Sequence, residues 1–242
     1  MEELIKLGTW SEEKLDRILR ETWRLSDPSN KIAFLSKEFL ETPYNASTLI
    51  GNGETSEVFV INLEHVDCFT YLDYVEAMRL SQSYNEFVAN VRRIRYRAGR
   101  VSYPGRNHFF TDWIDGNKKN VRDITGEAGS GKSRKITKTL NDKGNGTYYL
   151  SAVPCRQRVI RYVPADLADE SVMTNLQTGD YIGIYSGKKG LDVSHVGIFI
   201  RDEKRCAVLR HASSRHMKVM DEDFSEYIQD TPGILIFRAE PS

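Results

Sequence analysis

The chain has 242 residues, of which 40% are hydrophobic, and its 34 Lys and Arg residues balance its 34 Asp and Glu residues. This balance excludes a net field that would draw the whole protein to nucleic acid or to an acidic membrane, and no apolar run is long enough to span a membrane. The length predicts a single domain over residues 1–242.

Two helices are predicted near the N-terminus. Ser11 can cap the first, because Glu12 and Glu13 then lie in its first turn, near the positive end of the helix dipole. The second follows Pro28 and ends before Pro43, since proline stops a helix. Both have apolar residues at helical spacing, namely Leu15, Ile18, Leu19, Trp23, Ile32, Leu35 and Phe39.

The N-terminus and the cysteines bear on the compartment of the protein. The first residues, MEELIKLGTW, lack the basic and then apolar layout of an export signal. The protein is therefore either exported, for example to the periplasm, after removal of a signal, or cytoplasmic. Cys68, Cys155 and Cys206 are odd in number and far apart, which predicts neither a disulfide framework nor a zinc site. At least one thiol is free.

A third helix is predicted to begin at Asp67, in the sequence DCFTYLDYVEA. With Asp67 as the N-cap, Cys68 takes the first helical position, where the dipole and the free backbone N–H groups favour a thiolate over a thiol. The alternative is a buried structural cysteine, which is the more common case and our interpretation of Cys155 and Cys206. A reactive thiolate would also need a base.

The middle of the chain, from about Tyr96 to Thr147, is rich in Gly, Asn, Lys and Arg and predicts long, partly irregular loops. Residues 126–133, GEAGSGKS, match the pattern of a phosphate-binding loop. Such a loop needs a buried strand before it and a helix after it, but the residues on both sides are too polar or too rich in glycine. We therefore expect a flexible basic loop around Lys132 rather than a nucleotide site.

The last third of the chain predicts strands. From Asp180 onward the apolar stretches are DYIGIY, VSHVGIFI, CAVLRH and GILIFR, separated by turn residues, as in an antiparallel meander. Helices first and strands last predict an α+β fold in which N-terminal helices pack on a mostly antiparallel sheet.

Two of the five histidines lie in these strands. Alternation sends His195 to the face opposite Val196, and His211 ends the next strand. If the two strands pair, the two imidazoles come close at the edge of the sheet, where they could serve Cys68. Spacing alone leaves both possibilities open, a Cys-His-His site or unrelated positions. The others, His65, His108 and His216, lie in polar surroundings that predict solvated side chains.

Five short motifs occur in an order that carries a family resemblance. They are Pro43-Tyr44, Asp67-Cys68, Gly179-Asp180, His195-Val196-Gly197 and His211-Ala212. This order resembles that of the NlpC-type cysteine peptidases, papain-like bacterial cell-wall amidases and endopeptidases. The N-acetylmuramoyl-L-alanine amidase-like branch is similar over roughly residues 32–238. It matches this chain in VDCFTYLDYVEA, IRYRAGR, RNHFFTDWIDGN, GLDVSHVGIFI and HASS.

The resemblance implies a papain-like, NlpC-type fold with a catalytic Cys-His-His site. Cys68 would be the nucleophile, His195 the general base and then acid, and His211 the residue that orients His195. Tyr44 would line the site, and the backbone N–H of Cys68 would stabilise the oxyanion. Phe69 replaces the small hydroxyl residue usual after the cysteine, and the segment between nucleophile and base is longer than in the simplest relatives. Relative to this family, residues 1–31 would be an N-terminal helical extension and residues 96–150 an insertion that shapes the cleft.

That long segment contains a dense polar and aromatic cluster, which we expect to line the substrate cleft. An Arg there could bind a stem-peptide carboxylate, and an aromatic ring could pack on a sugar or lactyl group. The alternative is a loop that docks on the core through Phe109 and Trp113. The candidates for substrate binding are Arg106, Asn107, His108 and Trp113 in the cluster, Tyr44 and Asp67 near Cys68, and Asp192 and Ser194 near His195.

The resemblance implies a hydrolase of peptidoglycan or muropeptide fragments, most specifically an N-acetylmuramoyl-L-alanine amidase. An endopeptidase that cuts after γ-D-glutamate is the alternative with the same chemistry. A phosphate-loop nucleotide-binding protein and a non-catalytic wall-binding module are alternatives from other classes. We expect a monomer that needs no metal or other cofactor and binds no nucleic acid.

Overall fold

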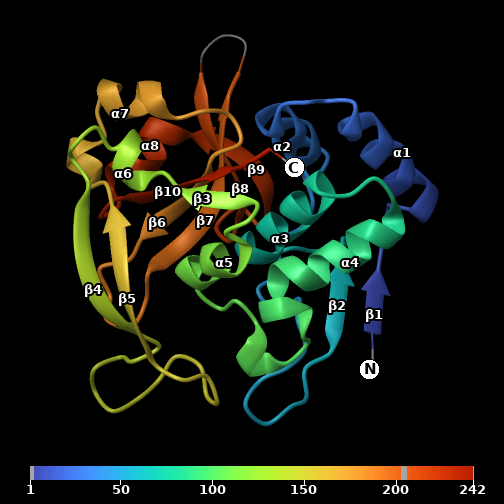
Figure 1. Ribbon diagram of the computed structural model, residues 1–242, viewed down its shortest axis with the longest axis horizontal. Helices are drawn as coiled ribbons and strands as arrows, with labels where there is room; N and C mark the ends of the chain where they lie inside the picture. Colours follow the sequence, from blue (N-terminus) through green and yellow to red (C-terminus); the bar gives the residue numbers. More distant parts are fainter. Residues whose placement is uncertain (1–2, 203–205, 242) are drawn as a thin grey trace.

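The computed structural model describes residues 3–202 and 206–241, and its four longest helices gather on one side of a sheet (Figure 1). The helical side contains α1 (Glu12–Trp23), α2 (Pro28–Lys37), α3 (Cys68–Arg79) and α4 (Tyr84–Arg95). Ser11 caps α1 and Asp27 caps α2 through their side chains, so the two predicted helices are confirmed. The N-terminal segment is not only helical, because β1 (Glu3–Lys6) pairs in parallel with β2 (Phe59–Asn62).

Within the described residues, six strands form an antiparallel sheet in the order β3-β10-β6-β7-β8-β9. Its members are β3 (Val121–Asp123), β6 (Tyr181–Tyr185), β7 (Val193–Arg201), β8 (Ala207–Ser213), β9 (Lys218–Asp223) and β10 (Ile234–Ala239). Strands β6, β7 and β8 are the predicted meander. Strand β9, with the sequence KVMDED, was missed because alternating charges replace its apolar face.

Both faces of this sheet are covered. On one face, Val196 and Ile198 pack into the core that contains α3. On the other, Phe199 and Leu209 pack into a second core with Phe224, under the short helices α6 (Thr125–Ala128), α7 (Glu170–Asn175) and α8 (Phe224–Gln229). The N-terminal helices were predicted to pack on the sheet, whereas these three short helices were not predicted.

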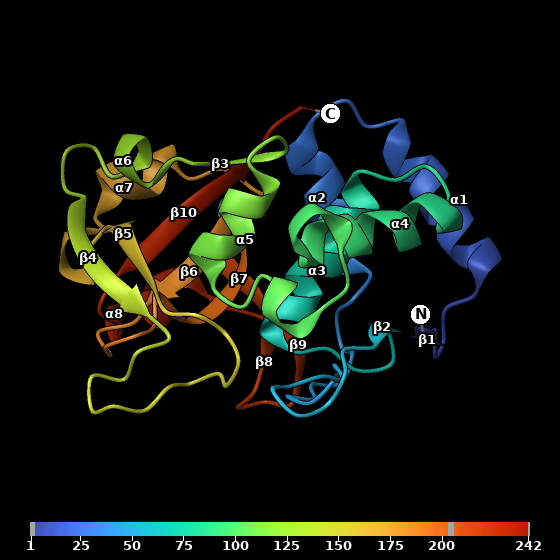
Figure 2. The same cartoon turned by 60° about the horizontal axis from the view of Figure 1, so that its bottom comes forward.

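The middle of the chain is more regular than its composition predicts. It forms helix α5 (Phe110–Asn117) and the hairpin of β4 (Arg134–Leu140) and β5 (Arg156–Tyr162), whose long loop extends beyond the sheet (Figure 2). Three short 3₁₀ helices cover Arg97–Gly99, Tyr103–Gly105 and Ala165–Leu167. The hairpin escaped prediction because most of β4 is exposed and polar, so it lacks an apolar stripe.

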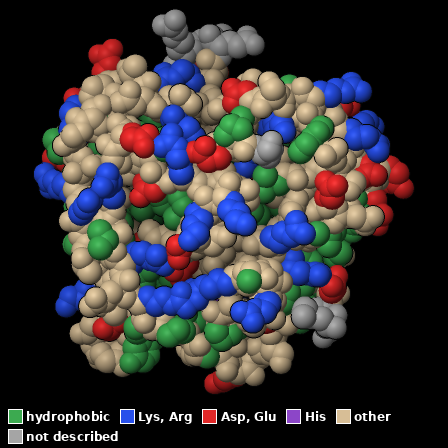
Figure 3. Space-filling model, in the orientation of Figure 1, with side chains coloured by type: hydrophobic (Ala, Val, Ile, Leu, Met, Phe, Trp, Pro, Cys, Tyr) green, Lys and Arg blue, Asp and Glu red, His purple; other side chains and the backbone are tan. Residues whose placement is uncertain are grey.

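Although the whole chain has no net charge, residues 118–162 are locally basic. Residues 118–162 contain eleven Lys and Arg against three Asp and Glu, so the rest of the chain carries the opposite excess. Figure 3 shows Lys and Arg side chains across the middle of one face.

Residues 126–133, which match the sequence pattern of a phosphate-binding loop, do not have the structure of one. A three-residue edge strand, β3, precedes it, and strand β4 rather than a helix follows it. Lys132 Nζ lies 2.5 Å from Asp169 Oδ1 and 2.7 Å from Ser171 Oγ. Lys132 is thus engaged by Asp169 and Ser171, and β4 occupies the place of the helix whose N-terminus would hold a phosphate, which argues against the nucleotide-binding alternative.

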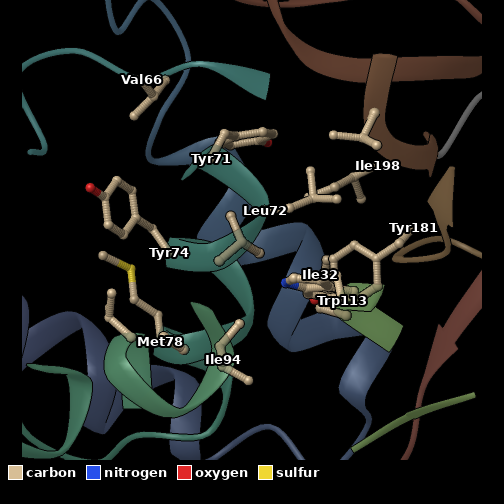
Figure 4. Close-up of a cluster of buried hydrophobic side chains, with 14 of the residues drawn as sticks. Ile32, Val66, Tyr71, Leu72, Tyr74, Met78, Ile94, Trp113, Tyr181 and Ile198 are labelled. Atoms are coloured by element: carbon tan, nitrogen blue, oxygen red, sulfur yellow. The ribbon is translucent and has the colours of Figure 1, made fainter. Parts of the chain in front are cut away.

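Helix α3 is the centre of the larger core. Every residue from Thr70 to Arg79 is buried, and Figure 4 shows its side chains among Ile32, Trp113, Tyr181 and Ile198. Its charged residues find partners inside the protein. Asp73 accepts hydrogen bonds from Arg95 Nε at 2.7 Å and from Trp113 Nε1 at 3.1 Å.

Replacement of Asp73 by Ala should destabilise the protein strongly. The change leaves the Arg95 guanidinium buried without its counter-ion, which costs about 3–5 kcal/mol. Urea denaturation would measure the free energy of unfolding. Asp166→Ala, at an exposed carboxylate, is the matched control and should stay within about 0.5 kcal/mol of the parent. Equal effects of the two changes would contradict the role of the buried pair.

Candidate active site

Cys68 is the first residue of α3, as the sequence predicts. Asp67 caps the helix: its Oδ1 accepts hydrogen bonds from the backbone N–H groups of Phe69 and Thr70, at 2.8 and 2.7 Å. Thr70 returns the bond through its hydroxyl, which accepts from Asp67 N at 3.0 Å. Because Thr48 also donates to its Oδ2, both carboxylate oxygens of Asp67 have partners at the start of the helix.

Residues Pro43 and Tyr44 fix the chain in front of the cysteine. Val66 N donates to Pro43 O at 3.0 Å, and Tyr44 N donates to Met217 O at 2.9 Å. The segment at 43–44 thus joins the approach to α3 with the turn between β8 and β9. Burial is the first cause that raises the pKa of Tyr44, so a neutral phenol lies near the cysteine.

A β-bulge sets the position of His195. Opposite Ile184 and Tyr185 of β6, strand β7 places His195 and Val193, so Ser194 is an extra residue between them. Bulges re-aim neighbouring side chains and occur often beside active sites. Here the bulge ends the regular ladder one residue before His195.

The two predicted histidines meet. His195 Nε2 lies 2.7 Å from His211 Nδ1, and His211 Nε2 lies 2.6 Å from Glu222 Oε2. Glu222 was missed by the sequence analysis. Its only signal would have been pairing of the unrecognised strand β9 with β8, where Glu222 is diagonal to His211 on the same face.

Two cavities meet at His195. The first, of about 340 Å³, is lined by Cys68, His195 and mostly apolar side chains, including Phe69, Phe109, Phe110, Tyr149 and Leu150. The second, of about 630 Å³, is lined by both histidines, Tyr227 and polar side chains, including Arg215, Glu222, Glu226 and Asp230. Ser194 and His195 line both. The nucleophile candidate and the base candidate therefore line the same cavity, and His195 also borders the second one.

The protonation states differ from the prediction of a thiolate. Burial, followed by the charge of Asp67, raises the pKa of Cys68 to about 12, although backbone N–H groups of Val196, Cys68 and Phe69 act against this. Burial, followed by His211, lowers the pKa of His195 to about 3. At neutral pH both groups are uncharged, chiefly because both are buried, and at Cys68 the Asp67 carboxylate also opposes the helix dipole that was expected to favour the thiolate.

Three residues of the predicted substrate wall are structural instead. Trp113 is fully buried, with its ring 5.3 Å from the ring of Tyr181 in β6. Arg106 forms a two-pronged ion pair with Glu57, with Nη2 at 2.7 and 2.6 Å from the two carboxylate oxygens. The side chain of Asn107 donates to Ile94 O at 2.9 Å. The alternative of a segment docked on the core therefore describes these three side chains.

Asp192, Ser194 and His108 do line the first cavity. The Oδ2 atom of Asp192 accepts from Thr111 N at 2.7 Å and from Thr111 Oγ1 at 2.8 Å, so Asp192 ties α5 to β7. The ring of His108 is mostly buried and its Nε2 lies 2.7 Å from Tyr103 O, which contradicts the prediction of a solvated side chain. Burial is the first cause that lowers the pKa of His108 to about 4.

Cys155 and Cys206 are exposed, which contradicts their interpretation as buried structural cysteines. His216 is 43% exposed, as predicted. Within residues 3–202 and 206–241, no helix is long and apolar enough to cross a membrane.

Comparisons with known proteins agree with the motifs. The model of the N-acetylmuramoyl-L-alanine amidase-like family matches residues 34–234. An N-acetylmuramoyl-L-alanine amidase from Bacteroides uniformis is similar, with 28% identity and a TM-score of 0.76 over 88% of this chain and 99% of that one. A Legionella pneumophila protein shares the fold, with 21% identity and a TM-score of 0.80 over 95% and 94%.

A Bacteroides fragilis protein with the provisional name of xylanase is also similar, with 29% identity and a TM-score of 0.71 over 84% of this chain and 98% of that one. A comparison with curated proteins found no match.

Alkylation of Cys68 should report its raised pKa. In a Cys155→Ser, Cys206→Ser variant, iodoacetamide should modify Cys68 slowly at neutral pH, and the rate should still be rising at about pH 10, because the thiolate is the reactive form. The Cys68→Ala variant, which keeps the two exposed thiols, gives the reference rate. A rate that is already constant below about pH 7 would instead indicate a thiolate–imidazolium pair.

Proposed function

The chain belongs to the N-acetylmuramoyl-L-alanine amidase-like family, and we propose that it is a cysteine hydrolase that cleaves the amide bond between the muramoyl lactyl group and L-alanine in peptidoglycan. The observation that carries the proposal is the cleft in which Cys68 at a helix start shares one cavity with His195, itself hydrogen-bonded to His211. The fold would be papain-like, of the NlpC type, with α3 against β7 and β8.

The proposed reaction begins with attack of Cys68 Sγ on the carbonyl carbon, while its proton passes to a ring nitrogen of His195. His195 Nε2 is bonded to His211, so Nδ1 is the atom that takes this proton. The carbonyl oxygen becomes an oxyanion, for which the backbone N–H of Cys68 is the donor at the helix start. No ion pair exists beforehand, because both groups are neutral in the free protein.

The intermediate then collapses. His195 gives the proton to the leaving nitrogen, the C–N bond breaks, and the stem peptide leaves with a free amino group. The acyl group stays on Cys68 as a thioester. Water attacks this thioester as His195 accepts its proton, and the thiol and a lactyl carboxylate are released.

The mostly apolar cavity beside Cys68 suits the acyl side of this substrate. Its aromatic side chains, among them Tyr149 and Phe109, can pack on a sugar ring or on the lactyl methyl group. Neutral His108 and Ser194 supply polar contacts at the same wall. Action on the intact wall would require export of the protein, whereas action on recycled fragments would be compatible with the cytoplasm.

Mass spectrometry of purified muropeptides incubated with the protein should show products with an intact stem peptide and a free lactyl carboxylate. Cys68→Ala should give none, because the nucleophile is gone. Products cut after γ-D-glutamate would indicate an endopeptidase instead. If the protein leaves every muropeptide intact, the assignment to peptidoglycan fails. EDTA should not change the products, whereas complete alkylation of Cys68 should abolish them.

The pH dependence should follow the lowered pKa of His195. The base must be neutral to accept a proton, and its pKa of about 3 lies below the ordinary value, so protonation requires more acid. We therefore expect kcat/KM to stay constant from about pH 7.5 to about pH 5. Circular dichroism over the same range controls for unfolding. A fall centred near the ordinary histidine pKa of about 6.5 would contradict the buried, neutral base.

A further inference from the structure

A line of hydrogen bonds joins the proposed base to a carboxylate that the proposed reaction does not use. His195 Nε2 lies 2.7 Å from His211 Nδ1, and His211 Nε2 lies 2.6 Å from Glu222 Oε2. The side chain of His211 is 2% exposed and that of Glu222 is 24% exposed. Glu222 therefore stands where the buried histidine pair reaches the second cavity.

The hydrogen bond to Glu222 determines which ring nitrogen of each histidine carries the proton. An ionised carboxylate only accepts hydrogen bonds, so His211 donates to Glu222 from Nε2. Burial is the first cause that lowers the pKa of His211, and the neutral ring has a single N–H. His211 Nδ1 must then accept from His195 Nε2, and His195, also neutral, is left with a bare Nδ1.

We propose that Glu222 is a positioning residue that sets the tautomers of both histidines and so leaves His195 Nδ1 free to accept the proton of Cys68. This inference rests on the proposed cysteine hydrolase. Without a carboxylate at 222, His211 can carry its proton on Nδ1. His195 Nε2 would then be the acceptor, and the protonated Nδ1 could take no proton from the thiol. Glu222 also supplies negative charge when His195 becomes an imidazolium in a buried place.

The neighbouring groups do not change which atom donates in each of these two hydrogen bonds. The ring of Tyr227, from α8, packs on His211 and His195 at centroid distances of 5.0 and 6.1 Å. Burial raises the pKa of Tyr227 to about 12, so it is neutral. His216 Nε2 lies 3.8 Å from Glu222 Oε1, the oxygen that does not face His211. Asp221, on β9, also raises the pKa of His211, but its effect is smaller than those of burial, Glu222 and His216.

The competing role for Glu222 is direct contact with a cationic part of the substrate in the second cavity. Glu226 lines the same cavity, and its side chain is exposed at the N-terminal turn of α8. Glu226→Gln is therefore a matched control, since it removes a carboxylate from the cavity but not from the histidines. A substrate contact would change KM, whereas a positioning residue changes kcat.

Kinetics on the muropeptide that the wild type cleaves give the first test. Glu222→Leu should lower kcat on the order of 10²–10⁴-fold, the contribution of a general base, with KM changed less than about threefold. Glu222→Gln, which keeps an acceptor oxygen, should lose less, and Glu226→Gln should keep the wild-type kcat. A Glu222→Leu protein with raised KM and unchanged kcat would overturn the proposal.

Nitrogen-15 NMR of histidine-labelled protein gives the second test and needs no substrate. We expect the wild type to carry the proton on Nε2 in both His195 and His211, with signals assigned through His195→Gln and His211→Gln. A proton on Nδ1 of His195 would overturn the proposal, even if Glu222→Leu does not fold. The NMR measurement of the tautomers does not depend on the peptidoglycan assignment. Failure of muropeptide cleavage and failure of the tautomer prediction are therefore separate results.

Discussion

The burial of charged residues on α3 is the constraint on which the rest of the structure depends. Asp73 takes its partners from α4 and α5, through Arg95 and Trp113. Glu76 accepts from Arg79 at 2.6 Å and from Tyr181 of β6 at 2.7 Å. A buried charge that loses its partner is costly, so these bonds hold the helices and the sheet in one arrangement. Cys68, at the start of the same helix, is thereby placed against β7.

The site that results differs electrostatically from a helix start that activates a thiol. The cap of Asp67 puts a negative charge beside Cys68 and uses the first free N–H groups of α3. Burial then disfavours both the thiolate and the imidazolium. Charge separation must therefore accompany the reaction, which makes the groups behind His195 more important than they would be in a solvated site.

The sequence predicted the parts of the molecule whose signals are local. Caps and helical spacing located α1 and α3, and apolar runs located β6, β7 and β8. Cys68 lies on α3, His195 on β7 and His211 on β8. The family resemblance is confirmed by the family match over residues 34–234. The rest depends on partners distant in the chain. Glu222 comes close to His211 only because β9 pairs with β8. Trp113, which composition placed in the cleft, is drawn into the core by the bond to Asp73.

The middle segment shapes the cleft through attachment rather than through free polar side chains. Lys138 of β4 donates to the backbone carbonyls of Ser186, Lys188 and Leu191, and Asp192 accepts from Thr111 of α5. These bonds fix the loop between β6 and β7, which leads directly to the bulge at Ser194. Because three carbonyl groups converge on one buried ammonium group, the loop has few other conformations open to it. The segment between nucleophile and base therefore contributes to the site chiefly by holding the start of the strand that carries His195.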